Sequence, residues 1–332
     1  QNQATIATVL SSDNQTLEDS DMNLRLGVHV GQQNMSMASL RQLWRKLDGQ
    51  VDWISAWDHF YEAPPAGGTI DHFEAMTTLG ALAADTQHAT IGVMVLYVGY
   101  RNPASIAKAA STLDHISNGR FELGLGAGWH AQEANAFGYD FPSVGIRLDM
   151  LEEATTIIRQ MLTQDRTTFS GEHYTVENAS NLPMPIQDRL PIWIGGVGEK
   201  RTLKIVAEKA DGWNAAYISA DNFSRLNGVL DQWCERADRD PASLARSIHL
   251  TFNLGTTQAS VDVQREKLRE AWGTAAERIE GGALLCTPTE AIDRLNEYRE
   301  KGATMINVAL RAPWDEEALE AYLEEVIPQI RQ

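Results

Sequence analysis

Patterns typical of buried strands and of amphipathic helices alternate along almost the whole chain, and this alternation constrains the fold more than any other feature. Short apolar runs such as Leu24–Val30 are each followed by a longer segment with apolar residues at helical spacing, such as Met35–Leu47. Eight or nine such units follow one another without a low-complexity linker. The α/β pattern therefore predicts a closed (β/α)8 TIM barrel, with a two-domain doubly wound fold as the alternative.

The remaining strands of the expected barrel are short and apolar. They are predicted at Trp53–Trp57, Thr90–Leu96, Phe121–Leu125, Pro191–Ile194, Gly212–Ala215, Ile248–Leu254, Ala283–Cys286 and Met305–Leu310. One connection, Thr163–Leu190, is long and polar, which is typical of a lid or an insertion, and it would lie between the fourth helix and the fifth strand. Residues 1–21 lack Lys, Arg and an apolar segment, so we interpret them as a disordered extension or an expression remnant, and residues 22–332 as one domain.

The composition narrows the class of partner. The net charge of −17 argues against nucleic acid and against an anionic membrane surface, because both need a basic face on the protein. No apolar run approaches the roughly 20 residues of a membrane-spanning helix. Cys234 and Cys286 match no metal or redox spacing, and the histidines form no metal-binding motif, so we expect buried thiols and no metal site. Neither a disulfide framework nor secretion is indicated, and a cytoplasmic location is expected.

The stretch Ser111–Glu133 combines a helix end, a tight turn, a buried strand and a glycine-lined exit. The turn Asn118-Gly119 supplies the left-handed residue that ends a helix, because glycine has no Cβ to clash there. Gly124, Gly126 and Gly128 then recur at alternate positions, although glycine is unfavourable in a strand unless something needs the space. Two explanations stay open: close packing of a helix on the strand, or the flat ring of a ligand on the strand end.

In a TIM barrel the active site is built at the carboxyl ends of the strands, and this rule selects candidate residues without reference to any family. The candidates follow the first five strands and are His29 to Gln32, Asp58-His59, Met94 to Arg101, Ala127 to Gln132, and Gly195 to Gly198. The last of these segments runs into an expected helix at Glu199–Ala210. Backbone N–H groups that converge at such a helix start bind anions, above all phosphate, although an ordinary strand–helix turn is the alternative.

The pair Asp58-His59 is the candidate for acid–base chemistry. An imidazole at a strand end can accept or donate a proton near neutral pH, and the adjacent Asp58 carboxylate could orient it. Without other evidence, a capping aspartate and a packed histidine are the simpler interpretation. Trp57 and Trp129 could wall an aromatic pocket or belong to the core.

These same stretches resemble the bacterial luciferase-like family of flavin and deazaflavin oxidoreductases, from Met22 to near the C-terminus. The motifs that carry the resemblance are Trp57-Asp58-His59, Tyr100-Arg101-Asn102-Pro103, and residues 113–120 (LDHISNGR), 124–129 (GLGAGW), 191–196 (PIWIGG) and 210–214 (ADGWN). The chain looks most like the branch that uses coenzyme F420, a deazaflavin that passes hydride, with FMN as the alternative cofactor. The resemblance implies a TIM barrel with an insertion, a small-molecule substrate and a homodimer.

By this resemblance, the cofactor lies at the strand ends. The histidine that matches His59 lies near the reactive ring and serves as acid or base, and the Met94-Val95 bond is a non-proline cis peptide in a bulge that supports the ring. The positions that resemble the cofactor-binding residues of the family are Met94, Val95, Ala127, Gly128, Trp129, Gln132, Gly195, Gly196, Val197 and Gly198. The predicted substrate pocket is completed by His29, Gln32 and Trp57.

One position departs from the family pattern. The sugar-phosphate dehydrogenases of this branch have a glutamate directly after the GxG turn, where this chain has Trp129. An aromatic side chain there suits a flatter or more apolar substrate, while Glu133 is either an orienting carboxylate or part of a helix surface. We therefore expect an oxidoreductase that moves a hydride between F420 and a small organic substrate. The alternatives are an FMN-dependent monooxygenase that uses O2 and a cofactor-binding barrel without catalysis.

Overall fold

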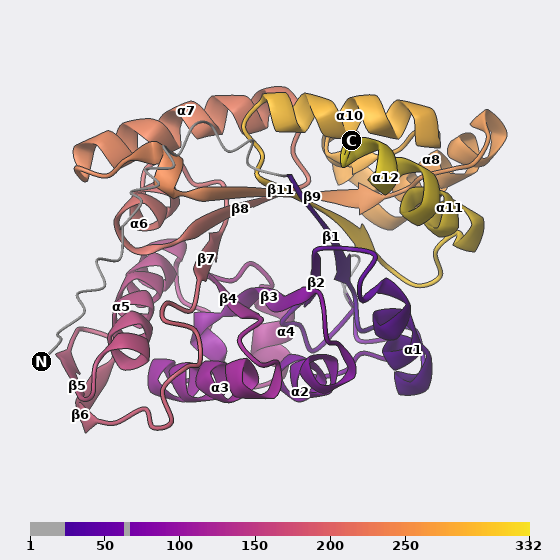
Figure 1. The fold of residues 1–332 in the computed structure, drawn as a ribbon. Coiled ribbons are helices and arrows are strands. Elements are labelled where there is room, and N and C mark those ends of the chain that lie inside the picture. Colours follow the sequence, from indigo (N-terminus) through magenta and orange to yellow (C-terminus); the bar gives the residue numbers. More distant parts are fainter. Residues whose placement is uncertain (1–23, 63–66) are drawn as a thin grey trace, which may run out of the picture.

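Eight parallel strands close a barrel in the computed structural model, which describes residues 24–62 and 67–332 (Figure 1). In ring order the strands are β1 (Arg25–Val30), β2 (Trp53–Ala56), β3 (Thr90–Tyr97), β4 (Phe121–Gly126), β7 (Ile192–Gly195), β8 (Gly212–Ala216), β9 (Ala245–Phe252) and β11 (Met305–Leu310). The ring closes because β11 pairs with β1, with Met305 opposite Arg25. The predicted TIM barrel is confirmed, whereas the predicted extension at residues 1–21 lies outside the described residues.

Helices surround the barrel and alternate with its strands. They are α1 (Met37–Leu47), α2 (Ala75–Asp85), α3 (Pro103–Ile116), α4 (Ala131–Ala136), α5 (Val144–Thr163), α6 (Thr202–Lys209), α7 (Ala220–Arg236), α8 (Gln258–Trp272), α9 (Ala276–Glu280), α10 (Pro288–Glu300), α11 (Glu316–Ala321) and α12 (Ile327–Ile330). Local sequence sets their starts. At α3, Asn102 Oδ1 accepts the Ala104 amide at 2.9 Å and Pro103 occupies the first turn, where no N–H is needed.

Two predicted elements are shorter in the structure. The predicted helix Glu199–Ala210 begins only at Thr202, as α6, because a loop in which Gly196 has a φ of 135° precedes it. The predicted strand Ala283–Cys286 shortens to β10 (Ala283–Leu284), which pairs with β9 as an addition to the eight-stranded ring. The chain leaves β10 early because Thr287 already caps α10.

The core forms between the strands and the helix faces that cover them. In α1 the buried residues Leu40, Leu43, Trp44 and Leu47 recur at helical spacing, as the sequence pattern requires. Inside the barrel, a second cluster consists of Trp53, Met94, Trp193 and Met305. The two thiols are buried and unpaired, which confirms that part of the prediction.

The predicted insertion lies between α5 and β7 and contains an antiparallel hairpin of β5 (Thr167–Ser170) and β6 (Thr175–Ala179). It is bonded along α3, on the flank of the barrel (Figure 1). Asp114 of α3 fixes it most firmly, because its carboxylate accepts the Ile186 amide at 2.7 Å and the Gln187 side chain at 2.6 Å. The polar residues of this segment therefore bond the insertion to the barrel.

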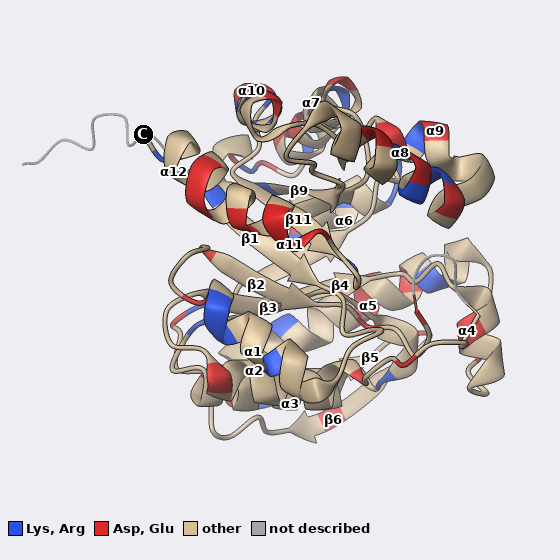
Figure 2. Ribbon diagram, turned by 90° about the vertical axis from the view of Figure 1, so that its right-hand side faces the viewer, with Lys and Arg blue, Asp and Glu red and all other residues tan. Residues whose placement is uncertain are grey.

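Many of the acidic residues lie on the outer helices, among which α11 and α8 are prominent (Figure 2). α11 alone contributes Glu316, Glu317 and Glu320. This placement follows from the excess of Asp and Glu in the composition. None of the described helices is long and apolar enough to cross a membrane.

Candidate active site

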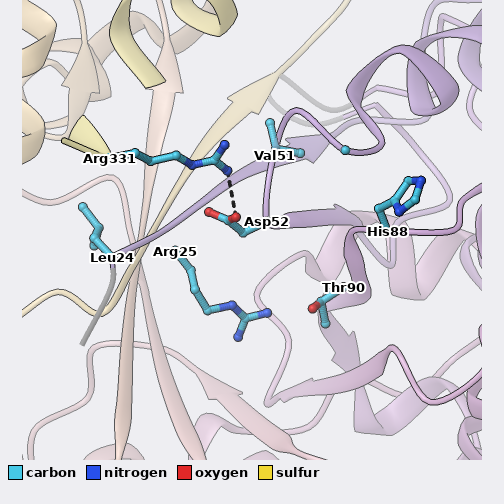
Figure 3. A pocket seen from close by; sticks show the side chains of 8 residues that line it. Leu24, Arg25, Val51, Asp52, His88, Thr90 and Arg331 are labelled. Atoms are coloured by element: carbon cyan, nitrogen blue, oxygen red, sulfur yellow. Dashed lines mark hydrogen bonds and ion pairs between the residues drawn. The ribbon is translucent and has the colours of Figure 1, made fainter. Parts of the chain in front are cut away.

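One cavity, of about 550 Å³, lies at the amino ends of β1, β2 and β3 (Figure 3). Its lining residues are Leu24, Arg25, Gly49, Val51, Asp52, His88, Thr90 and Arg331. Arg331 and Asp52 form an ion pair at 2.7 Å in it. Catalytic residues of TIM barrels come from the carboxyl ends of the strands, so this cavity is at the wrong end for catalysis and the candidate site is built from the strand ends instead.

A bulge at the end of β3 shapes one half of the barrel mouth. The Met94-Val95 peptide is cis, as the resemblance implies, and the register between β3 and β4 shifts between Val93 and Leu96. Met94 is buried in the interior cluster, while Val95 remains partly exposed. Because of the bulge, Met94 faces the barrel interior while its neighbour Val95 faces the barrel mouth.

The glycines of β4 and β7 make room for this bulge. A Cβ on Gly124 would lie 2.1 Å from the Val93 carbonyl oxygen, and a Cβ on Gly126 or Gly195 would lie 2.5 or 2.8 Å from the Val95 side chain. Of the two explanations that the sequence left open, close packing therefore applies, with a neighbouring strand rather than a helix as the partner. The result is a low surface of backbone and one valine side chain.

The loop after β7 leaves part of its backbone exposed. The Gly196 amide is used, because it donates to the Asn214 carbonyl oxygen at 3.0 Å. Val197 and Gly198 are exposed, and within the described part of the chain their amides donate to no protein acceptor. Gly198 is required because a Cβ there would lie 2.7 Å from the Thr202 hydroxyl at the start of α6. The loop therefore offers two amides, not a complete ring of them, to an anion.

His59 is oriented by a carboxylate from another strand end. Its Nδ1 lies 3.1 Å and 3.2 Å from the two carboxylate oxygens of Glu133. An ionised carboxylate only accepts hydrogen bonds, so Nδ1 carries a proton, and in the neutral ring Nε2 is the nitrogen that keeps its lone pair. The imidazole is partly exposed, with 14 % of its side chain accessible, whereas the Glu133 side chain is 1 % accessible. The pair thus presents a proton acceptor, Nε2, at the barrel mouth.

Glu133 is held ionised by its donors. Burial raises the pKa of a carboxyl group, but hydrogen bonds from the His59 ring, the Tyr61 amide and the Tyr100 hydroxyl outweigh this effect and lower the pKa of Glu133 to about 2. The Tyr100 hydroxyl donates at 2.8 Å, and the amides of Phe60 and Tyr61 donate at 2.8 Å and 2.9 Å. Glu133 is therefore negatively charged at neutral pH.

The Asp58 carboxylate hydrogen-bonds Arg101 and the backbone of β3 rather than His59. Asp58 is buried. Its carboxylate accepts hydrogen bonds from both terminal nitrogens of Arg101, at 2.8 Å and 2.9 Å, and from the Tyr97 amide at 3.0 Å. Burial raises its pKa, and the Arg101 guanidinium and the Tyr97 amide oppose that shift. Of the two carboxylates that the sequence analysis considered for orienting His59, Glu133 is the one that hydrogen-bonds it. Asp58 instead ties the end of β2 to the end of β3.

Aromatic rings surround His59. Trp129 is 60 % accessible, its ring lies edge-on to His59 at 5.3 Å, and it stacks on the ring of His130. Trp57 lies 6.5 Å from His59 and is buried. Its indole N–H donates to His72 Nε2 at 2.8 Å, which fixes the ring. Trp129 is therefore an exposed ring beside His59, whereas Trp57 is a buried ring whose position is fixed by its hydrogen bond to His72.

The other predicted pocket residues lie close to Trp57. His29 is buried, its Nδ1 lies 2.7 Å from the Ser55 hydroxyl, and its ring lies 5.2 Å from Trp57. Gln32 is fully buried, and its amide bonds both the N–H and the carbonyl oxygen of Trp57. Gln32 thus supports Trp57 and is not accessible itself. Gln132 is exposed on α4, and the Ala127 carbonyl oxygen accepts Arg147 Nε at 3.0 Å.

The sequence analysis missed α4 as an element and with it the burial of Glu133. The signal was present, because the buried residues His130, Glu133 and Ala134 recur at helical spacing directly after β4. The six residues of α4 are short and mostly polar or small, so their sequence does not indicate that Glu133 is buried. Its burial depends on donors from two other strand ends.

The comparison with known families follows this geometry. A model described as luciferase-like monooxygenase matches residues 53–305. The chain belongs to the luciferase-like monooxygenase family. The match begins at the first residue of β2 and ends at the first residue of β11, so it includes the His59–Glu133 pair and the glycine loop after β7.

Individual members of the luciferase-like family show different extents of similarity. An uncharacterized protein of Mycobacterium tuberculosis is 32% identical over 163 residues, which is 49% of this chain and 56% of that protein. An F420-dependent glucose-6-phosphate dehydrogenase of Kineococcus radiotolerans is 28% identical over 305 residues, 84% of this chain and 88% of that enzyme. The first match thus spans little more than half of the relative's length.

Solved structures share the barrel. An F420-dependent secondary alcohol dehydrogenase in complex with an F420–acetone adduct superposes with a TM-score of 0.81 at 19% identity, over 93% of this chain and 100% of that one. The oxygenating constituent of 3,6-diketocamphane monooxygenase of Pseudomonas putida, in complex with FMN, gives a TM-score of 0.69 at 16% identity, over 92% and 99%. At sequence identities of 19% and 16%, the structural similarity establishes only that these proteins share the fold.

Proposed function

We propose that this protein is an F420-dependent oxidoreductase that transfers a hydride between coenzyme F420 and the carbon of a small alcohol or carbonyl compound. The observation that carries the proposal is the His59–Glu133 pair, which places a proton acceptor at the same barrel mouth as the glycine-rich ends of β4 and β7. The F420-dependent relatives named above support the choice of cofactor. The FMN-containing neighbour makes FMN the alternative cofactor.

The residues at the strand ends fit a flat ring with an acidic tail. Val95 sits over Gly126 and Gly195, so the ends of β3, β4 and β7 present a surface on which a planar ring can rest. The exposed amides of Val197 and Gly198, with the nearby Lys200 in the same loop, suit a phosphate group. Coenzyme F420, when bound, supplies the hydride acceptor or donor, and the protein supplies orientation and proton transfer.

His59 handles the proton that accompanies the hydride. As the carbinol carbon loses its hydride and its oxygen becomes a carbonyl, the hydroxyl proton moves to Nε2 of His59. Glu133 holds Nδ1 and stabilises the positive charge that then develops on the ring. In the reverse direction the same nitrogen returns the proton to the oxygen. Trp129 lies edge-on to the imidazole, and its exposed ring borders the site where the substrate would bind.

The test is the variant His59→Ala with F420 and a panel of small secondary alcohols. We expect kcat to fall by roughly 10²- to 10⁴-fold, because general base catalysis contributes about that much, while the dissociation constant of F420 stays within about threefold. His88→Ala is the matched control, since His88 is exposed at the opposite end of the barrel and its substitution should leave turnover unchanged. Unchanged turnover in His59→Ala would reject the role of His59.

The homodimer remains a prediction from the resemblance, and the cytoplasmic location remains a prediction from the composition. Sedimentation equilibrium of the purified chain tests the first of them. A single species at the monomer mass at micromolar concentration would contradict it.

A further inference from the structure

Arg311 stands at the mouth in the half of the barrel that the cofactor proposal leaves unused. It follows β11 directly, and β11 lies opposite β4 in the ring, four strands away in either direction. The glycine surface and the anion loop belong to β3, β4 and β7. A group bound at Arg311 would therefore face the ring from across the mouth, where the substrate of the proposed reaction must lie.

Three aromatic rings enclose the Arg311 guanidinium. Its central carbon lies 5.4 Å from the ring of Trp57, 5.2 Å from that of Tyr217 and 5.5 Å from that of Trp272. Cation–π contacts at these distances favour the charged group and hold its plane, while the rings displace water from it. A partly desolvated cation attracts an anion more strongly than one in bulk water, because less solvent screens the charge.

Tyr217 fixes the guanidinium from the end of β8. Its hydroxyl lies 2.8 Å from Arg311 Nη2, and its backbone has a φ of 57°. That left-handed conformation is unfavourable for a tyrosine and is found where the surroundings require it, often at functional sites. The turn at Tyr217 thus brings its ring and hydroxyl to the mouth, and these place the guanidinium.

Trp57 links Arg311 to the proposed acid–base group. The same indole that lies 5.4 Å from the guanidinium carbon lies 6.5 Å from the His59 ring. The guanidinium carbon and the imidazole centre are thus at most the sum of these two distances apart, which a small organic molecule can bridge. His29, beside Trp57, has its pKa lowered by burial first and by the positive charges of its neighbours, so it stays neutral and leaves the positive charge to Arg311.

We infer that the substrate carries an anionic group, such as a carboxylate, that Arg311 binds while the hydroxyl or carbonyl of the same molecule lies at His59. This inference rests on the proposed function and adds a substrate class to it. Planar carboxylates match the fork of a guanidinium, and such charge-assisted hydrogen bonds are the strong ones. The rest of the molecule would lie along Trp57, which suits a flat or apolar skeleton.

The test compares alcohols with and without a carboxylate. Matched probes are 3-hydroxybutyrate with butan-2-ol and 4-hydroxypentanoate with pentan-2-ol, with F420 reduction as the readout. For the wild type we expect a KM about 10- to 100-fold lower for the acid of a pair than for its neutral partner, since a hydrogen bond to a charged group contributes that much. Arg311→Gln should raise the KM of the acids to that of the neutral alcohols with kcat little changed. Arg311→Lys should keep part of the preference.

Two further measurements separate the possible outcomes. Arg269→Gln removes an exposed arginine on α8 and should leave both KM values unchanged. The dissociation constant of F420 should stay within about threefold in Arg311→Gln, and a large loss of F420 affinity would assign Arg311 to the cofactor tail and overturn the inference. An equal preference of the wild type for acids and neutral alcohols would also overturn it, although F420-dependent turnover of the neutral alcohols would leave the proposed function standing.

Thermal stabilisation of the F420-loaded protein decides the case in which none of these alcohols is turned over. Benzoate should then raise the melting temperature of the wild type but not of Arg311→Gln, while benzyl alcohol should affect the two proteins alike. No stabilisation of the wild type by any of the carboxylates would contradict an anion subsite at Arg311.

Discussion

Glu133 joins three neighbouring strand ends at the scale of single residues. It lies on α4, directly after β4. Its carboxylate accepts hydrogen bonds from two backbone amides and the His59 imidazole in the segment after β2, and from the Tyr100 hydroxyl in the segment after β3. Because these donors lower its pKa to about 2, its ionised form stabilises the folded state above about pH 4.5, and this stabilisation is lost as the pH falls towards 2. Glu133 is thus a positioning residue for His59.

Substituting Glu133 tests this positioning role. Glu133→Gln should lower kcat by about 10- to 100-fold and change F420 affinity by less than about threefold, because a neutral amide neither fixes the proton on Nδ1 nor stabilises the charged ring. Nitrogen-15 NMR of the imidazole should show the Nδ1–H tautomer of His59 in the wild type and a mixture in the variant. Glu133→Asp, which keeps the charge, should recover part of the activity.

A matched carboxylate separates positioning from general stabilisation. Glu153, on α5, accepts hydrogen bonds from the amides of Glu172, His173 and Tyr174 at 2.7–3.0 Å, and it is far from His59 in the chain. Glu153→Gln should lower stability to a similar extent and leave kcat and the His59 tautomer unchanged. If the two variants lost activity equally, Glu133 would have no role beyond structure.

At the scale of elements, the β3 bulge and the glycines of β4 depend on each other. Val95 and the Val93 carbonyl oxygen occupy the space in which Cβ atoms of β4 would lie. The alternate glycines were visible in the sequence, but their cause was not, because the neighbour that needs the space comes from a strand about 30 residues earlier whose bulge local patterns do not encode.

Gly124→Ala should strongly destabilise the protein. Its Cβ would lie 2.1 Å from a backbone oxygen, which cannot move as a flexible side chain could, so we expect a loss of about 3 kcal/mol or more in the free energy of unfolding, measured by urea denaturation. Gly80→Ala on α2 is the control, because nothing lies within 4 Å of its Cβ position and alanine favours a helix by up to about 1 kcal/mol. A Gly124→Ala protein as stable as the wild type would contradict the packing argument.

At the scale of the whole molecule, the alternation of strands and helices was sufficient to predict the barrel, because each unit can bury its apolar faces in few other ways. The site was predicted only in part. Residues adjacent in sequence, such as Asp58 and His59, suggested a partnership that the structure replaces with one between residues 74 positions apart, His59 and Glu133. Arg311 gave no signal, because the rings that enclose it come from three other segments.

Two buried histidines and the partly buried His72 make the stability of the whole molecule depend on pH. Burial first lowers the pKa of His72 to about 4 and that of His249 to about 3, and it lowers the pKa of His29 well below its ordinary value. The unfolded chain binds protons at these rings where the folded chain does not, so the free energy of unfolding falls as the pH drops below about 6.5. Above that pH these groups are neutral in both states and contribute no slope.

His249→Gln should reduce this slope. Each fully neutral buried histidine contributes roughly 1.4 kcal/mol per pH unit between its unfolded and folded pKa values, so the variant should lose about that much slope between pH 6 and pH 4 in urea denaturation. An identical slope in His249→Gln and the wild type would show that His249 is protonated in the folded protein or neutral in both states.

Equilibrium titration of the purified full chain with F420 and with FMN tests the central claim most directly. Both cofactors are followed by changes in their fluorescence, and the stabilisation that each gives against heat is measured in parallel. The account predicts that F420 binds at least about tenfold more tightly than FMN and raises the melting temperature more. Tighter binding of FMN, or binding of neither molecule, would contradict it.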